Sequence, residues 1–330
     1  MNKQNILVCP LDWGLGHAAR CVPLIHQFLE EGHRVIIGAD NNPLALLKQE
    51  FPQLQTIVIP GYEVNYGQKG SALKLFYEGV KFYNFIKKEK QFIEQILEEY
   101  QIDKIVSDNR YGLFSRKVES ILITHQVYPK FPVGEGMVQV KIDQLLYNFD
   151  EVWIPDYEGE NNLSGDLAHL KPFLQKHSFI GPLSRFEKPI QQPTLEFDVC
   201  AIFSGPEPQR TIFEELVLKQ IKDQRLKAVV VRGLPNDENE QGGFVFNHLP
   251  TKTLQKFILK SKLVVCRSGY SSIMDLSVLD KPALLVPTPG QTEQEYLAIY
   301  HKNKGKFTTK LQGEFNLQST LWEMEGSYGN

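Results

Sequence analysis

Apolar and polar positions follow one another in blocks that predict a regular succession of short strands and helices. Apolar runs such as Asn5 to Pro10 and Val199 to Phe203 are typical of buried strands. Each is followed by a loop containing glycine and then by apolar residues at helical spacing, as in Val22 to Leu29. Strands that alternate with helices form parallel sheets covered by helices on both faces. The pattern therefore predicts a doubly wound α/β protein.

The length of the chain predicts two domains. The sequence has 330 residues, of which 42% are hydrophobic, enough for two buried cores. Residues 187–194 are polar and contain two prolines, which is typical of a linker. We expect an N-terminal domain over 1–186, a C-terminal domain over 195–311 and a final helical segment over 312–330.

Charge and cysteine usage exclude several classes of protein. The net charge of -3 gives no general attraction to nucleic acid. The cysteines Cys9, Cys21, Cys200 and Cys266 lack C-x-x-C spacing and indicate reduced core residues. No signal peptide and no apolar run of membrane-spanning length is evident. We expect a cytoplasmic protein, with attachment to the inner face of the membrane left open.

Residues 263–296 carry most of the functional signal. The strand Leu263 to Cys266 turns at Ser268 and Gly269 into a helix, and a second strand, Ala283 to Val286, precedes a polar cluster at 293–295. In a parallel sheet both polar clusters lie at the carboxyl ends of strands, where open α/β sheets bind ligands.

The residue types in this stretch suit a sugar nucleotide. Small residues at a helix start leave amide N–H groups open to phosphate, and the hydroxyls of Ser271 and Ser272 add donors. One turn later, the Asp275 carboxylate is able to accept from the vicinal hydroxyls of a ribose. Glu293, Gln294 and Glu295 offer polar groups to a polyhydroxyl ligand. Singly these residues also suit a helix cap or an exposed helix, but together they favour a nucleoside diphosphate joined to a sugar.

The first glycine loop supports two interpretations. Gly14, Gly16 and Ala19 satisfy G-x-G-x-x-A, and Asp40 ends the next strand, as in dinucleotide-dependent dehydrogenases. The alternative centres on His17. The positive end of a helix favours a neutral imidazole, so this histidine is a candidate base or orients an acceptor hydroxyl.

Two further polar clusters follow predicted strands in the N-terminal half. Asp108 comes after the strand at 105–106, and His125 and Gln126 come after the strand at 121–124. We expect both clusters to line the acceptor side of a cleft, and Asp108 is a second candidate base.

Residues 73–97 interleave aromatic side chains with lysines. This pattern predicts an amphipathic helix whose apolar side either faces the core or rests on anionic lipid.

The second half resembles the nucleotide-sugar signature of the GT-B glycosyltransferases. It is most similar to the MurG-like family, whose members transfer N-acetylglucosamine to a lipid-linked acceptor, and it includes a Cys-Arg-Ser-Gly lead-in. The resemblance implies two Rossmann-like, doubly wound domains facing a central cleft, with the segment 312–330 packing back toward the N-terminal domain. The residues that carry it are Gly269, Tyr270, Ser271, Ser272, Asp275, Glu293 and Gln294.

The resemblance also implies roles for single residues. Asp275 would hold the ribose hydroxyls, and Arg185 would lie near the donor phosphate. The family has a Gln pair at the donor sugar where this chain has Gln294 and Glu295, which leaves the sugar open between N-acetylglucosamine and another hexose. The Gly14 to His17 loop is similar to the family's Gly-Gly-His.

Two other loops are assigned by the same resemblance. Ser204 and Gly205 occupy the place of a phosphate loop that is richer in glycine in the family, while prolines reduce the amide donors here. His248 and Leu249 lie where a turn reads the base, expected to be uracil.

The sequence therefore predicts an inverting glycosyltransferase that uses a UDP-sugar as co-substrate. No Asp-x-Asp motif occurs, so no metal and no other cofactor is expected, and helix N-termini with Arg185 would stabilise the leaving diphosphate. The acceptor is unknown, with lipid-linked alcohols among the candidates. A UDP-sugar epimerase using carboxylates such as Glu207, Glu293 and Glu295 is the main alternative; a dinucleotide-dependent dehydrogenase leaves 263–296 unexplained.

Overall fold

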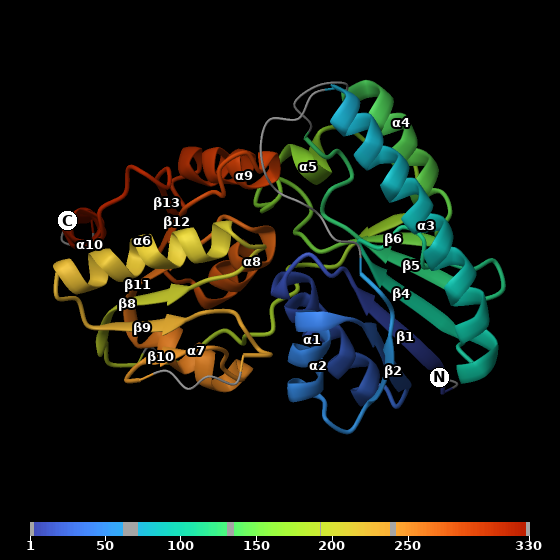
Figure 1. Cartoon of the computed structure of the whole chain (residues 1–330), viewed down its shortest axis with the longest axis horizontal. Helices are drawn as coiled ribbons and strands as arrows, with labels where there is room; N and C mark the ends of the chain where they lie inside the picture. The colour runs from blue at the N-terminus through green and yellow to red at the C-terminus, as the bar shows by residue number, and fades with distance from the viewer. Residues whose placement is uncertain (1–2, 62–71, 131–134, 192, 238–241, 328–330) are drawn as a thin grey trace. The chain divides into compact units, whose positions relative to one another are not determined.

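The computed structural model describes residues 3–61, 72–130, 135–191, 193–237 and 242–327 (Figure 1). The chain divides into two compact units, Met1–Trp13 with His17–Leu183 and Gly14–Gly16 with Ser184–Asn330. The division after Leu183 lies close to the predicted domain end at 186. Each unit is described by itself.

The first unit is built on a seven-stranded parallel sheet of order β3-β2-β1-β4-β5-β6-β7. The strand order reverses on either side of β1, which is the doubly wound topology expected from the alternation of strands and helices. The strands are β1 Asn5–Pro10, β2 Arg34–Ala39, β3 Gln55–Val58, β4 Lys104–Asp108, β5 Glu119–Ile123, β6 Glu151–Ile154 and β7 His177–Phe179. The helices are α1 Leu15–Glu30, α2 Asn41–Glu50, α3 Ala72–Tyr100, α4 Glu135–Leu146 and α5 Asp166–His169.

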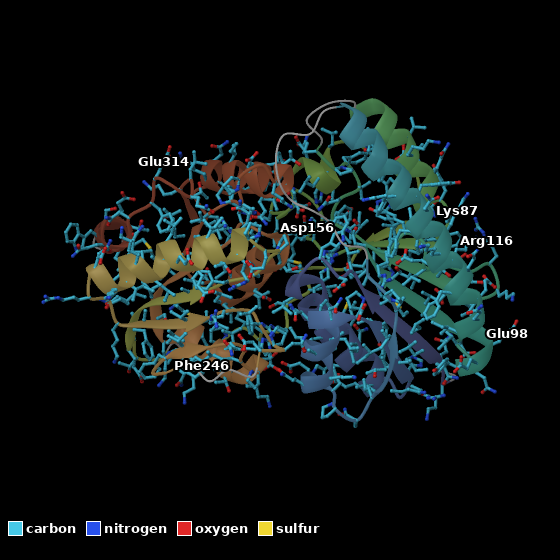
Figure 2. All side chains as sticks on the ribbon, viewed as in Figure 1. Lys87, Glu98, Arg116, Asp156, Phe246 and Glu314 are labelled. Carbon is cyan, nitrogen blue, oxygen red and sulfur yellow. The ribbon has the colours of Figure 1, made fainter. Side chains whose placement is uncertain are left out.

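Helix α3 shows which side of the aromatic and lysine pattern is buried. Ile86, Ile93 and Ile96 pack into the core of the first unit. Tyr83 is 57% exposed, and the ammonium of Lys87 lies 4.7 Å from its ring, on the outward side of the helix (Figure 2). The described part of the 73–97 stripe therefore faces mainly the core; the side chains of 73–80 lie outside the described residues. None of the helices in the described part of the chain is long and apolar enough to cross a bilayer.

The second unit is built on a six-stranded parallel sheet of order β10-β9-β8-β11-β12-β13. Its central strands β8, β11 and β12 are the apolar runs that the sequence analysis identified. The strands are β8 Phe197–Ile202, β9 Ala228–Val231, β10 Val245–Phe246, β11 Ser261–Cys266, β12 Ala283–Leu285 and β13 Thr308–Thr309. The helices are α6 Gln209–Asp223, α7 Thr251–Leu259, α8 Tyr270–Leu279, α9 Thr292–Asn303 and α10 Leu317–Ser327.

The C-terminal helix α10 packs within the second unit, and the packing of 312–330 toward the N-terminal domain stays a prediction. Phe315, Leu317 and Leu321 belong to the same buried cluster as the apolar side of α6. The amide of Gln220 on α6 donates to the carbonyl of Phe315 at 3.0 Å, and its Oε1 accepts from the N–H of Leu317 at 2.9 Å. Burial of these apolar side chains against α6 fixes the helix there.

The four cysteines are buried free thiols, as predicted. Burial raises the pKa of Cys9, Cys200 and Cys266 to about 12, so these thiols stay protonated and unreactive at neutral pH.

A buried ion pair joins α3 to the loop after β4. Arg110 Nε donates to Glu89 Oε1 at 2.6 Å, and its other nitrogens donate to the carbonyls of Ile59 and Pro60. The second Glu89 oxygen accepts from the N–H of Gly112 at 3.1 Å. Burial raises the pKa of Glu89, although Arg110 opposes the shift. Arg110 therefore has a structural role and does not line an acceptor site.

Removing one partner of this pair leaves a buried charge without compensation. We expect Arg110→Met to lower the free energy of unfolding of the first unit by about 3–5 kcal/mol. The double variant Glu89→Leu/Arg110→Met recovers most of that loss, because neither charge remains buried. Urea unfolding followed by circular dichroism measures both; a single variant as stable as the wild type contradicts the assigned role.

Candidate active site

His17 and Asp108 come together at the carboxyl edge of the first sheet. Strands β1 and β4 pair with Pro10 beside Asp108, and α1 begins at Leu15, so its first turn lies over the end of β4. The ring nitrogen Nδ1 of His17 lies 3.2 Å from Asp108 Oδ1. An ionised carboxylate only accepts, so Nδ1 carries the hydrogen in this contact and Nε2 is left able to accept a proton.

Arg20 clamps the same carboxylate from one turn further along α1. Its Nε donates to Asp108 Oδ2 at 2.7 Å, and its Nη2 forms an ion pair with Oδ1. Burial alone would raise the pKa of Asp108, but the charge of Arg20 and the contact with His17 outweigh it and hold the pKa at about 2. A carboxylate held ionised in this way is a poor proton acceptor. The geometry disfavours Asp108 as the base and makes it the group that orients His17.

His125 and Gln126 follow β5, and their part in an acceptor site stays a prediction. His125 is buried, and its Nδ1 lies 3.2 Å from Nη1 of Arg20, so it contacts the guanidinium that clamps Asp108. The N–H of Gln126 donates to the hydroxyl of Thr124 and completes a local turn.

The glycine loop between β1 and α1 precedes His17. Gly14 has a φ of +121°, a conformation that an L side chain rarely adopts, and Gly16 lies in the first turn of α1.

The start of α8 in the second unit has the properties of an anion site. Gly269 is its N-cap and offers no side-chain acceptor, so no capping side chain competes with an anion for the N-terminal amide groups of the helix. Ser271 and Ser272 lie in this first turn. Ser268 and Tyr270, in contrast, are buried, and the Ser268 hydroxyl donates to the carbonyl of Gln294 at 2.8 Å. These two predicted donor residues therefore hold the loop in place.

Asp275 and Arg185 lie close together although 90 positions separate them. Asp275 Oδ1 accepts from the hydroxyl of Ser184 at 2.6 Å. Burial raises the pKa of Asp275 to about 6, while the charge of Arg185 and the Ser184 hydrogen bond lower it. A carboxylate that is partly protonated near neutral pH, beside a guanidinium, is a common feature of functional sites.

Side chains of the polar cluster at the start of α9 accept hydrogen bonds from the backbone of the preceding turn. Gln294 Oε1 accepts from the N–H of Thr288 at 2.9 Å, and Glu295 Oε1 accepts from the N–H of Gly290 at 2.8 Å. Glu293 lies in the first helical turn. The side chains of Gln294 and Glu295 therefore shape the turn between β12 and α9.

The loop between β8 and α6 offers fewer anion donors than α8. Gly205 has φ of +102°, which permits the tight turn after Ser204. Pro208, the residue before α6, has no N–H, and the carboxylate of Glu207 accepts from the N–H of Thr211 at 3.2 Å. Because a carboxylate already accepts from an amide group at this helix start, the loop offers fewer free donors to an anion than α8 does.

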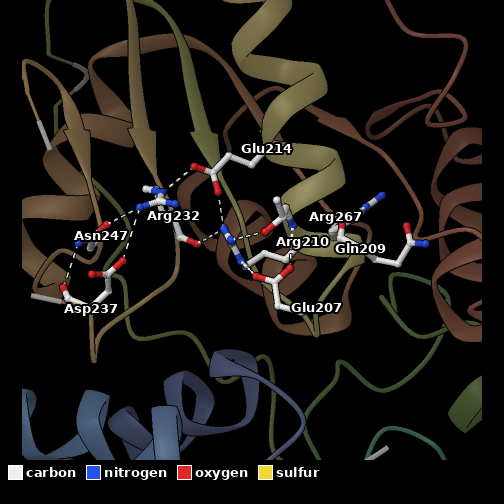
Figure 3. A network of polar contacts seen from close by, with 9 residues as sticks. Glu207, Gln209, Arg210, Glu214, Arg232, Asp237, Asn247 and Arg267 are labelled. Carbon is white, nitrogen blue, oxygen red and sulfur yellow. Dashed lines mark hydrogen bonds and ion pairs between the residues drawn. The ribbon is translucent and has the colours of Figure 1, made fainter. Parts of the chain in front are cut away.

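A buried network of charged side chains joins this loop to the turn that carries His248 and Leu249 (Figure 3). Glu214 on α6 pairs with Arg210 and with Arg232, and Nη1 of Arg232 donates to Asn247 Oδ1 at 3.0 Å. Sequence reasoning missed this network. The spacing of Arg210 and Glu214 on one helix face was the only available signal.

Arg267, of the Cys-Arg-Ser-Gly segment, is a second buried arginine in this unit. Its guanidinium lies 4.1 Å from the ring centroid of Phe213 and donates to the carbonyls of Pro287 and Gln209. Burial lowers its pKa to about 10, so it stays charged and ties three strand-end loops together.

No group of three or more His, Cys, Asp or Glu side chains suited to a metal occurs among the residues that the structure describes.

Sequence comparison connects the second unit with a known family. Residues 201–325 match the glycosyltransferase family 28 C-terminal domain. An uncharacterized glycosyltransferase of Methanosarcina acetivorans is 25% identical over 92% of this chain and 84% of its own length. A UDP-N-acetylglucosamine–N-acetylmuramyl-(pentapeptide) pyrophosphoryl-undecaprenol N-acetylglucosamine transferase of Rhodopseudomonas palustris is 34% identical over 25% of this chain and 21% of its own length.

Solved structures extend the similarity to the whole chain. MurG of Acinetobacter baumannii superimposes with a TM-score of 0.54 at 12% identity, covering 100% of this chain and 91% of that one. The glycosyltransferase SnogD of Streptomyces nogalater gives a TM-score of 0.60 at 12% identity, covering 96% and 89%. These matches agree with the two parallel-sheet units described above. The chain is therefore a glycosyltransferase of the GT-B fold whose residues 201–325 are similar to the C-terminal domain of family 28, which the MurG-like relative shares in part.

Proposed function

We propose that this glycosyltransferase moves a hexose from a UDP-sugar to an acceptor hydroxyl by an inverting, metal-independent displacement. The observation that carries this proposal is the pair His17 and Asp108, in which a clamped carboxylate holds Nδ1 of the imidazole. In such a pair, Nε2 takes the proton of the acceptor hydroxyl as its oxygen attacks the anomeric carbon. The bond from that carbon to the diphosphate oxygen breaks on the opposite face.

The donor end of the reaction is assigned to the second unit. The amide groups at the start of α8, the hydroxyls of Ser271 and Ser272, and Arg185 are the groups proposed to stabilise the negative charge of the leaving diphosphate. Asp275 is proposed to accept from the ribose hydroxyls, displacing the Ser184 hydroxyl that occupies Oδ1 at 2.6 Å. His248 and Leu249 are proposed to lie beside the uracil.

Two observations bear on the identity of the donor sugar. The Rhodopseudomonas relative is named as an N-acetylglucosamine transferase, which favours N-acetylglucosamine as donor sugar. Glu295, in place of a second glutamine, is a carboxylate without an amide donor, and its Oε1 accepts from the N–H of Gly290. N-acetylglucosamine and unmodified hexoses are therefore both proposed donors.

The acceptor is proposed to be a hydroxyl on a lipid-linked or other carrier. The same relative is named for an undecaprenol-linked acceptor, which supports the lipid-linked class. Peripheral contact of α3 with lipid stays a prediction, carried by the exposed Tyr83 and Lys87.

His17→Ala is expected to lower kcat by about 100-fold or more while leaving UDP affinity unchanged, because the variant removes only the base. Initial rates and isothermal titration with UDP measure the two effects, and added imidazole should restore part of the rate. The matched control is His26→Gln, an exposed histidine on the same helix. Wild-type kcat in His17→Ala would exclude the histidine as the base.

Asp275→Ala is expected to weaken UDP-sugar binding about tenfold or more, since the ribose hydroxyls lose an ionised acceptor. The pKa of Asp275 is raised to about 6, so its carboxylate is ionised above that pH and protonated below it. Wild-type affinity should therefore fall as the pH drops through about 6, and Asp275→Asn should abolish that dependence. Isothermal titration with a UDP-sugar, whose esterified diphosphate does not titrate there, measures this. Ser184→Ala is the control and should bind normally; unchanged binding in Asp275→Ala contradicts the ribose role.

Transfer activity is expected to persist in excess chelator, because amide groups, hydroxyls and Arg185 are assigned the charge stabilisation that a divalent cation would otherwise provide. Product formation with and without EDTA, followed by mass spectrometry, is the measurement. A rate that collapses in EDTA and returns with manganese would refute metal independence.

A further inference from the structure

The charged network of the second unit forms a continuous path between two loops that are separate in sequence (Figure 3). At one end, Arg210 Nε donates to Glu207 Oε1 at 2.6 Å, in the loop before α6. Arg210 also pairs with Glu214 and donates to the carbonyl of Arg232 at 3.2 Å. At the other end, Arg232 contacts Asn247 in the turn after β10. The path therefore joins the loop after β8 to the turn after β10 across the end of β9.

Arg232 is the residue through which this path passes. Its Nε donates to Glu214 Oε1 at 2.6 Å on one side, and its Nη1 donates to Asn247 Oδ1 at 3.0 Å on the other. Its backbone N–H donates to the carbonyl of Phe246 at 2.9 Å. A guanidinium makes both side-chain contacts at once because its donors form a rigid, planar fork.

Asn247 transmits the position of Arg232 to the neighbouring backbone. Its Nδ2 donates to the carbonyl of Asp237 at 2.9 Å, and its own carbonyl accepts from the N–H of Leu234 at 2.8 Å. Asn247 immediately precedes His248 and Leu249. Any shift of the Arg232 fork therefore moves the turn that carries these two residues.

The composition of the network points to a geometric role. Glu214 is 5% exposed and lies between two guanidinium groups. Buried ion pairs of this kind are seldom more stabilising than apolar side chains of the same volume, whereas their directional bonds fix relative positions. An apolar cluster at this sheet edge would fill the space without fixing the distance between the two loops.

We propose that Arg232 is a positioning residue that sets the base-reading turn at a fixed distance from the diphosphate loop and so determines selectivity for the nucleotide base. This inference rests on the proposed function, in which His248 and Leu249 lie beside uracil and Ser204 and Gly205 lie beside the diphosphate. Arg232 itself touches neither ligand. Its effect passes through Asn247 and Glu214.

The test is Arg232→Lys. Lysine keeps the positive charge, but its ammonium group lacks the planar guanidinium that contacts Glu214 and Asn247 at the same time. We expect the dissociation constant for UDP and the KM for the donor to rise about tenfold with kcat little changed. The dissociation constant for ADP should change less, so the ratio of the ADP to the UDP constant falls toward one. Isothermal titration with both nucleotides, well below the melting temperature, measures this ratio. The control is Arg225→Lys, the same chemical change at an exposed arginine that follows α6.

Asn247→Ala provides a second, independent variant should Arg232→Lys fail to fold. It should reproduce the loss of selectivity, and the double variant should bind UDP no more weakly than the weaker single variant, because both residues act through one path. Equal weakening of UDP and ADP, or unchanged UDP affinity, overturns the positioning role. A wild-type protein that does not bind UDP at all overturns the proposed function instead, and the inference with it.

Discussion

Guanidinium groups at the carboxyl ends of parallel strands, buried in the first unit and partly buried in the second, are the constraint on which the loops of both units depend. In the first unit Arg20 holds Asp108, and Arg110 holds Glu89. In the second, Arg232 holds Glu214. A ligand-binding edge of an α/β sheet consists of loops rich in polar backbone groups, which apolar packing alone does not orient. An arginine with up to five donors satisfies several such groups at once and fixes their directions.

The pattern of apolar and polar residues predicts some parts of the fold and leaves others undetermined. The strands β1, β8, β11 and β12 are short apolar runs, and their length and the glycine or proline loops after them identify them as strands. The parallel arrangement of the strands and the doubly wound class then follow from the alternation of strands and helices. The sequence pattern does not predict where α10 packs, because an amphipathic helix of that length is compatible with packing on either unit. In the structure, Phe315 and Leu321 share a buried cluster with the apolar side chains of α6.

The candidate site was predictable in its position but not in the role of each residue. Sequence placed Asp108, His125 and Ser268 at strand ends and Asp275 in the helix that follows, where the structure has them. It could not separate side chains that face a ligand from side chains that hold a loop, since both are polar and both follow strands. Ser268 and His125 proved to be buried supports, and that distinction depends on partners far away in the sequence.

The two carboxylates at the candidate site differ in a way that separates their tasks. Asp108 is fully buried but bonded to a guanidinium, and its pKa of about 2 makes it a permanent negative charge. Such a charge suits the orientation of a histidine and the stabilisation of the imidazolium that forms when His17 takes a proton. Asp275 also lies in a dehydrated environment, which raises its pKa to about 6, and its Oδ1 accepts from the neutral hydroxyl of Ser184. Ribose hydroxyls are able to replace a hydroxyl partner of this kind while the charge of Arg185 stays near the carboxylate. Asp275 is therefore suited to exchange partners when a nucleotide binds, whereas Asp108 is suited to keep its partner throughout.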